Sequence, residues 1–238
     1  MNKIKAITIV GIKQVLSDPM YMMFLLGLPV LMTWVMSLMP AEVYEMAILG
    51  VLVMFVALNI LTWAGGYIIE EKKTGTWDRI LSSKTSYIQI MTGYFIRIFI
   101  MAFAQSAILL LSGKYLFGAP WNYGFASILL VLCVYIFSMT GLGLFLAGIL
   151  KSSGQVQAVS MAIVMTGTML GGVMFTIDNP SAIINFITTI SPQSWAAHAM
   201  RDILTTGVSP DLLTPILWMT GLGTFLLLGG VMINKIKT

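Results

Sequence analysis

Residues 46–69 read MAILGVLVMFVALNILTWAGGYII, a stretch without a single charged side chain. A helix needs about 20 mainly apolar residues to cross the hydrocarbon of a bilayer, so this tract is long enough to do so. The whole chain has the same character, because 58% of its residues are hydrophobic and 9% are charged, against about 25% charged residues in a soluble domain. The composition therefore predicts an integral membrane protein.

Further apolar tracts on both sides of residues 46–69 predict an all-α protein with six transmembrane helices. The third span is the least regular, since Arg97 precedes its uncharged part and Lys114 follows it. Both side chains are expected to extend their charged ends toward the lipid headgroups. The six expected spans cover residues 20–39, 46–69, 94–117, 125–150, 156–177 and 212–233.

Two segments outside these spans are expected to lie at the membrane without crossing it. Residues 181–197 form a short apolar tract with Pro192 near its end, which favours a re-entrant or interfacial hairpin within residues 178–211. Residues 1–18 mix apolar residues with lysines, a pattern typical of an amphipathic helix at the inner interface. The chain is thus expected to form a single transmembrane domain over residues 1–238.

The basic residues predict the orientation, because Lys and Arg concentrate in cytoplasmic loops. With the N-terminus inside and six spans, Lys114 and Arg201 lie outside and Arg97 lies at the inner end of the third span. Both termini are then cytoplasmic, in a multi-pass protein of the plasma or inner membrane. The net charge of +4 needs no nucleic-acid partner on this topology. The basic residues expected inside are Lys3, Lys5, Lys13, Lys72, Lys73, Arg79, Lys84, Lys151, Lys235 and Lys237.

The charged segment over residues 70–86 reads EEKKTGTWDRILSSKTS and is the longest expected cytoplasmic loop. Thr74 and Gly75 interrupt the preceding helix, and Thr76 is a suitable N-cap for a short helix over residues 77–83. Asp78 in its first turn suits the helix dipole. The segment is either a docking surface or an ordinary solvated loop.

This segment resembles the cytoplasmic signature of type-2 ATP-binding-cassette (ABC-2) export permeases. A second stretch, SPQSWAAHAMRDILTTG over residues 191–207, is similar to the outer loop of that family. The chain departs from the family at Lys84, where proline is common, and at Ser191, where asparagine is common. The residues that match are Glu71, Gly75, Thr76, Asp78, Arg79 and Leu81 in the loop, and Pro192, Trp195, Arg201 and Gly207 in the hairpin.

The resemblance implies a permease subunit of an ATP-driven exporter, with residues 70–86 as the segment that couples it to a separate ATPase. In that family two permeases pair, as identical or related copies, and two ATPase subunits drive alternating access. The cargo would be an amphiphilic or hydrophobic molecule such as a peptide, an antibiotic or drug, or a lipid. The chain has no G-x-x-x-x-G-K-[ST] motif, so ATP and Mg²⁺ are expected on the partner, with no cofactor and no catalytic site on this chain.

Polar residues within the expected spans either pack against neighbouring helices or line a pathway. The main candidates are Asn59, Thr62, Gln105 and Ser106, with Ser138, Thr140, Thr166 and Thr168 also in this class. Several glycines, among them Gly141, Gly148, Gly167 and Gly171, favour close helix contact.

Other function classes find less support. His198 is the only histidine, so a multi-histidine metal site is excluded, and its role is either structural or proton-sensitive. An intramembrane enzyme would need convergent acids, metal ligands, or a nucleophile with its base. No acid lies deep in any expected span, which disfavours the alternative of a secondary transporter or channel without an ATPase.

Overall fold

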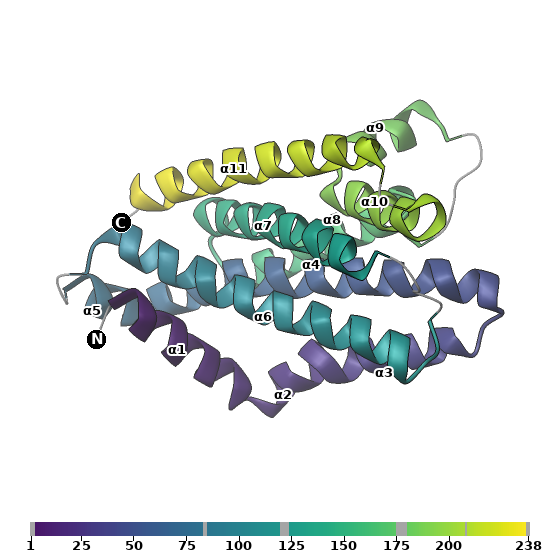
Figure 1. The fold of residues 1–238 in the computed structure, drawn as a ribbon. Helices are drawn as coiled ribbons and strands as arrows, with labels where there is room; N and C mark the ends of the chain where they lie inside the picture. The colour runs from purple at the N-terminus through teal and green to yellow at the C-terminus, as the bar shows by residue number, and fades with distance from the viewer. Residues whose placement is uncertain (1–2, 83–84, 120–123, 175–179, 208, 237–238) are drawn as a thin grey trace.

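The chain forms a bundle of helices in the computed structural model, which describes residues 3–82, 85–119, 124–174, 180–207 and 209–236 (Figure 1). Within these ranges helices alternate with turns, and no strand occurs. The helices are α1 (Lys3–Leu16), α2 (Pro19–Met22), α3 (Leu28–Ser37), α4 (Ala41–Lys73), α5 (Thr76–Ser82), α6 (Tyr87–Tyr115), α7 (Phe125–Ile149), α8 (Ser153–Leu170), α9 (Ala182–Ile190), α10 (Pro192–Thr206) and α11 (Leu213–Ile236), with a π-helical turn at Met23–Gly27 and a 3₁₀ turn at Pro210–Leu212.

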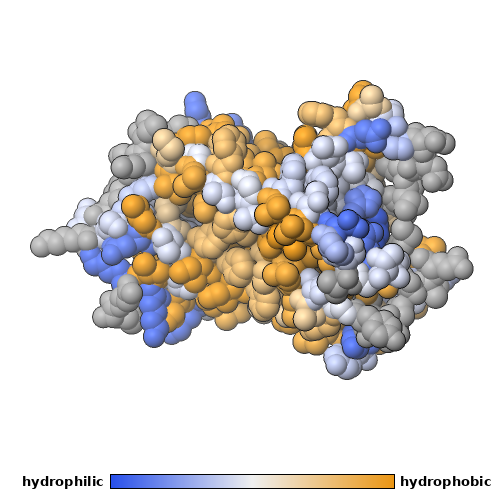
Figure 2. Space-filling view, turned by 45° about the horizontal axis from the view of Figure 1, so that its top comes forward, coloured by the Kyte–Doolittle hydropathy of each residue, from blue (hydrophilic) through white to orange (hydrophobic). Residues whose placement is uncertain are grey.

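Five helical stretches of the described chain are long and apolar enough to cross a membrane. The surface agrees with this, because an apolar band lies between more hydrophilic ends (Figure 2). The chain is therefore a polytopic membrane protein, as its composition predicts. The five stretches are Pro19–Ser37, Ala47–Lys73, Tyr87–Tyr115, Phe125–Ile149 and Pro210–Asn234.

The fifth expected span, residues 156–177, is not among these five stretches and coincides in part with α8. This helix has 18 residues, and Gln155 and Gln157 lower the hydropathy of its first turns. Residues 175–177 of the expected span lie outside the described residues. The crossing by α8 stays a prediction.

Local sequence signals explain where several helices begin. Asp18 caps α2, since its Oδ1 accepts hydrogen bonds from the backbone N–H groups of Met20 and Tyr21, at 2.9 Å and 3.3 Å. Ser86 and Gln89 form a reciprocal capping box that starts α6 at Tyr87. The helix that contains the third expected span therefore begins at residue 87, two helical turns before the expected start of the span at residue 94.

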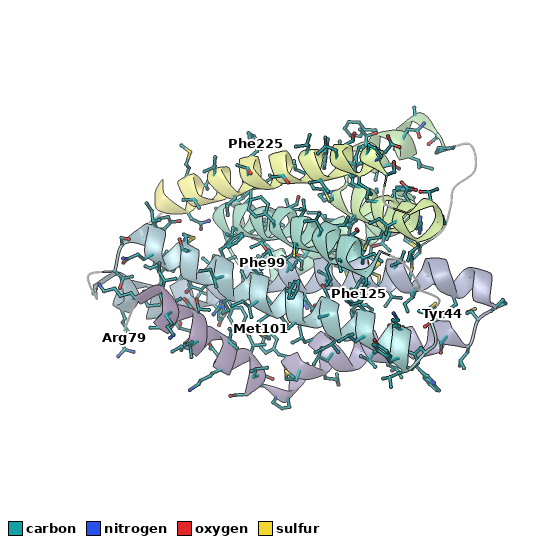
Figure 3. The ribbon with its side chains drawn as sticks, in the orientation of Figure 1. Tyr44, Arg79, Phe99, Met101, Phe125 and Phe225 are labelled. Carbon is teal, nitrogen blue, oxygen red and sulfur yellow. The ribbon has the colours of Figure 1, made fainter. Side chains whose placement is uncertain are left out.

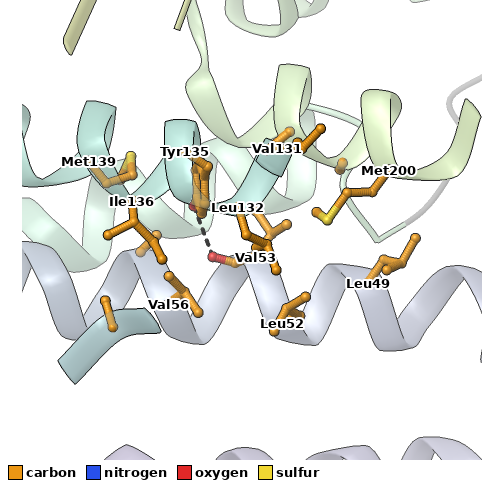
Figure 4. Close-up of a cluster of buried hydrophobic side chains, with 14 of the residues drawn as sticks. Leu49, Leu52, Val53, Val56, Val131, Leu132, Tyr135, Ile136, Met139 and Met200 are labelled. Atoms are coloured by element: carbon orange, nitrogen blue, oxygen red, sulfur yellow. Dashed lines mark hydrogen bonds between the residues drawn. The ribbon is translucent and has the colours of Figure 1, made fainter. Parts of the chain in front are cut away.

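The core surrounds α4, which is the most buried of the five stretches. Leu52, Val53 and Val56 of α4 pack against residues of α7 (Figure 4). Among those residues, Tyr135 is fully buried, and its hydroxyl donates a hydrogen bond to the carbonyl oxygen of Val53 at 2.9 Å. Because lipid does not drive apolar helices together, such close packing and polar contacts are what hold a membrane bundle.

Glycines bring α7 and α11 into backbone contact. A Cβ atom added to Gly141 would lie 2.5 Å from the carbonyl oxygen of Gly223, and one added to Gly230 would lie 2.7 Å from the backbone nitrogen of Phe145. The two helices therefore approach without side chains between them at these positions. The expectation of close contact at Gly141 is confirmed.

Different helices lie at the two ends of the bundle. The start of α1, the end of α11 and the short helix α5 lie at one end, here called the α5 end, and α9 and α10 lie toward the other (Figure 1). Arg79 and Tyr44 mark these opposite ends in Figure 3, where Phe225 lies on α11. The first and last helices thus share an end, as the charge distribution predicts.

Candidate coupling segment and outer hairpin

The segment between α4 and α6 folds into the short helix α5. The hydroxyl of Thr74 donates to the carbonyl oxygen of Glu70 at 3.0 Å, at the C-cap of α4. Gly75 then adopts a φ of +71°, a left-handed conformation that other residues rarely take, and turns the chain away from α4. α5 begins at Thr76 and covers most of the expected range 77–83.

The predicted coupling residues are divided between the surface and the interior. Thr76 and Arg79 are exposed on α5, whereas Glu71 is half-buried at the end of α4. The Oε2 atom of Glu71 is buried and has no hydrogen-bond partner within the described chain. The interpretation of residues 70–86 as an ordinary solvated loop therefore fails at Glu71. The side chains of Asp78 and Leu81, and the whole of Lys84, lie outside the described residues.

Trp77 anchors α5 to the bundle, a role that sequence reasoning missed. Only 2% of its surface is exposed. Its ring stacks on Tyr94 with centroids 6.3 Å apart and meets Tyr87 edge to face at 6.2 Å, both on α6. The Nζ of Lys72, on α4, lies 5.0 Å from the centre of the same ring. A displacement of α5 would thus act on both α4 and α6.

Arg97 lies in a buried cluster between α1, α4 and α6. Only 3% of it is exposed, so the expectation that it extends to the headgroups is wrong. Its guanidinium carbon lies 4.5 Å and 4.8 Å from the ring centres of Tyr67 and Tyr94, and Gly11 of α1 packs directly on the side chain. Glu71 also interacts electrostatically with it. The cation is stabilised by two aromatic faces and a nearby carboxylate in place of water.

The C-terminal helix is tied to the same end by polar contacts. Asn234 is fully buried on α11, and its Nδ2 donates to the carbonyl oxygens of Leu144 on α7 and Gly230. Its Oδ1 accepts a hydrogen bond from Lys72 Nζ at 3.3 Å. Trp77 and Asn234 are therefore linked through one lysine.

The candidate pathway residues lie inside the bundle. Asn59 and Gln105 are 6% and 0% exposed, and their amide nitrogens have no hydrogen-bond partner within the described chain. Ser106 instead donates to the carbonyl oxygen of Ala102 at 2.8 Å within its own helix, and Thr62 is half-buried. The choice between packing and pathway stays open for all four.

The segment predicted as an outer hairpin forms α9 and α10, which meet at Ser191. Trp195 Nε1 donates to the carbonyl oxygen of Thr189 at 2.8 Å, which fixes α10 to the end of α9. The Trp195 ring also stacks on Trp218 of α11, with centroids 5.7 Å apart. Pro192 is buried at the first position of α10, where proline is well suited because its missing N–H needs no partner.

Arg201 joins the hairpin to α8. Its guanidinium donates to the carbonyl oxygen of Gly172 at 2.7 Å and to that of Val173, just beyond the last turn of α8. A cation at this position also complements the negative end of the helix dipole. The pKa of Arg201 is lowered by burial and raised by Asp202. The matched residues of the hairpin thus hold α8, α9 and α11 together.

Metal chemistry has no candidate site in the part of the chain that the structure describes. No three His, Cys, Asp or Glu residues gather there closely enough to bind an ion. His198 is partly exposed on α10, and burial of the rest of its ring, followed by the charge of Arg201, lowers its pKa, while Asp202 raises it. The polar and aromatic residues of both segments thus serve as contacts between the helices of a membrane bundle.

Comparisons with known proteins agree with this. Residues 39–232 match the family model described as ABC-2 family transporter protein. The chain is similar to the linearmycin resistance permease protein LnrN of Bacillus subtilis (strain 168), at 32% identity over 158 residues, which are 66% of this chain and 40% of that protein. It is also similar to the probable multidrug ABC transporter permease YbhR of Escherichia coli (strain K12), at 21% identity over 169 residues, or 71% of this chain and 46% of the relative. The matched stretch is thus less than half the length of either relative.

Proposed function

The chain belongs to the ABC-2 family of transporter proteins, and on that premise we propose that it is the membrane permease subunit of an ATP-driven exporter. Its partners are a separate ATPase, which binds ATP and Mg²⁺, and a second permease copy of the same or a related kind. The protein lies in the plasma or inner membrane with both termini in the cytoplasm.

The observation that carries this proposal is the anchoring of α5. The helix exposes Thr76 and Arg79 at the end of the bundle that also holds both terminal helices, and it buries Trp77 against α6 and beneath Lys72 of α4. A partner protein can bind the exposed face of α5, and the buried Trp77 can transmit a displacement of α5 to the helices that span the membrane. We assign residues 70–86 as the coupling segment on this basis.

The coupling step is a change of population between two arrangements of the bundle. When the ATPase subunits close, they displace α5, and Trp77 transmits the displacement to Tyr94 and Lys72. The cluster around Arg97 lies directly behind Tyr94, so α1 and α4 respond together with α6. ATP shifts this equilibrium only to the extent that the ATPase binds one arrangement of α5 more tightly than the other.

The cargo we propose is an amphiphilic or hydrophobic molecule, such as an antibiotic, a drug, a peptide or a lipid. The support comes from the relatives, of which one is named for linearmycin resistance and another for multidrug transport. Polar groups such as Asn59 and Gln105, buried among apolar side chains, are the candidates for contact with the polar part of such a cargo.

The test is capture of the ATPase from native membranes with the tagged permease. Arg79→Glu reverses an exposed charge on α5 and is expected to reduce the recovered ATPase about tenfold, as loss of one charged contact does. Lys151→Glu, an exposed lysine between α7 and α8, is the matched control and should leave recovery unchanged. Export driven by an ion gradient, with no ATPase recovered from wild type, would instead establish a secondary transporter or channel.

A further inference from the structure

A groove runs between α1 and α6, two helices that lie side by side in the bundle (Figure 1). Its volume is about 310 Å³, near the lower end of the range for ligand pockets. Because Lys5 and Ile9 are exposed, the groove is open to the surroundings of the protein. The residues that line it are Ile4, Lys5, Thr8 and Ile9 of α1 and Ile96 of α6.

α1 packs closely against α6 next to this groove. The hydroxyl of Thr8 donates to the carbonyl oxygen of Gly93 at 3.3 Å. A Cβ atom added to Gly93 would lie 2.8 Å from Cγ2 of Ile7, and Gly11 packs directly on the side chain of Arg97. The groove is therefore bounded by a well-packed contact between two helices.

The lining of the groove combines aliphatic surface with one positive charge. Ile4, Ile9 and Ile96 provide the aliphatic part, and the hydroxyl of Thr8 is already used in its contact with α6. Lys5 is the charged residue of the lining, and the described residues that line the groove include no carboxylate. An occupant that matches this lining has an apolar chain and a negatively charged group.

The whole of α1 has the same chemistry as the groove. Its sequence, KIKAITIVGIKQVL, contains three lysines and no Asp or Glu. Its outer side is also apolar, since Ile9, Val10 and Leu16 are 38%, 63% and 52% exposed. A helix with this mixture of lysines and exposed apolar residues lies at the level of the lipid headgroups and is attracted to anionic lipids.

We propose that the groove binds one anionic phospholipid, with its phosphate at Lys5 and an acyl chain against Ile9 and Ile96. Lys5 and Ile9 are four residues apart and lie on the same face of α1, so a single lipid can contact both. The start of α1 lies at the α5 end, which is cytoplasmic in the proposed topology, and the cytoplasmic leaflet is the anionic one. The choice of leaflet rests on the proposed function, whereas the binding depends on neither the ATPase nor the cargo.

The test measures, by native mass spectrometry, the lipid that stays bound to the purified full-length protein in detergent. The probes are phosphatidylglycerol and phosphatidylcholine with identical acyl chains, which differ in net charge. We expect one molecule of phosphatidylglycerol to bind each chain with saturation, and phosphatidylcholine to bind about fivefold more weakly. Lys5→Gln should weaken the binding of phosphatidylglycerol about fivefold, as expected for the loss of one lysine beside an anionic lipid.

Two matched controls separate the groove from the general charge and polarity of α1. Lys13→Gln removes another exposed lysine of the same helix, which is not among the described residues of the lining, and should leave binding unchanged. Ile9→Trp fills the groove and should weaken binding of phosphatidylglycerol at least as much as Lys5→Gln does. Val10→Trp places the same side chain at the next exposed position, outside the described lining, and should bind the lipid as wild type does.

Three results would each overturn the proposal. Equal binding of the two lipids would show that the charge of the headgroup is not recognised. An equal loss in Lys13→Gln and Lys5→Gln would show that α1 attracts lipid through its total charge, and undiminished binding by Ile9→Trp would show that the groove is not occupied. The assay contains no ATPase, so its failure leaves the permease proposal standing, and failure to recover an ATPase leaves the lipid site standing.

Discussion

Arg97 shows how a charged residue is accommodated within a membrane bundle. Its neighbours are two aromatic faces and a glycine, and a cation over an aromatic ring is stabilised most when water is excluded. The nearby Glu71 contributes charge without a direct ion pair among the described contacts. This arrangement depends on Gly11, because a side chain there would occupy the space of the arginine.

The first prediction follows from that contact. Gly11→Ala is expected to lower the free energy of unfolding by about 1–3 kcal/mol, since the added methyl group overlaps Arg97 and forces α1 away from α6. Thermal unfolding in detergent measures the change. Gly66→Ala is the control, because nothing lies within 4 Å of a Cβ atom there. Equal effects of both substitutions would show that Gly11 matters only through helix propensity.

The second prediction concerns His198, whose pKa is lowered in the folded protein by burial and by Arg201. The unfolded chain, with the ordinary pKa of about 6.5, then binds a proton where the folded chain does not. Acidification therefore favours unfolding, and this contribution to stability is present above pH 6.5 and lost as the pH falls below it. The unfolding temperature of wild type should fall more between pH 7.5 and 5.5 than that of His198→Gln. A parallel fall in both proteins would contradict the assignment.

At the scale of helices, α5 is the element on which coupling depends. Trp77→Ala removes two aromatic contacts worth about 0.5–1.5 kcal/mol each, which is enough to reduce transport roughly tenfold if α5 loses its fixed position. ATP-driven export in vesicles measures the loss, and ATPase recovery should persist because Arg79 stays exposed. Trp77→Phe keeps a ring and should restore most of the activity. Full export by Trp77→Ala would remove Trp77 from the coupling route.

The positions of most helices could be predicted from short-range signals in the sequence. The turn at Gly75 and the tracts of uncharged residues predict where α5 and the long helices lie. α6 begins two turns before the expected span because Ser86 and Gln89 form a capping box there. The burial of Arg97 could not be predicted, since it depends on Gly11, far away in sequence, and on the way that α1 packs along α6.

Some residues of the candidate site could likewise be predicted from local motifs, and others could not. The motifs of the predicted coupling segment and outer hairpin point to residues such as Trp195 and Arg201, which make specific contacts between helices. The roles of the two segments stay predictions. Trp77 and Asn234 were missed, because an aromatic or amide residue in an apolar protein carries no signal of its partner. Their importance comes from contacts between helices that only the folded arrangement brings together.

For the whole molecule, the shared end of α1 and α11 has a bearing on the number of crossings. A chain whose termini lie on one side of the membrane crosses it an even number of times, and five candidate stretches require one more, which α8 would supply. We expect reporter fusions at both termini to be cytoplasmic, and a cysteine at Ser181 to react with an impermeant reagent from outside. Reaction from the cytoplasmic side alone would show that α8 does not cross.

The backbone contact of Gly141 with Gly223 has a consequence for how this bundle can move. Where the two backbones meet, no side chain lies between them that could deform, so we expect that α7 cannot slide along α11 without separating from it. Any rearrangement of the bundle is therefore expected to carry these two helices as one body.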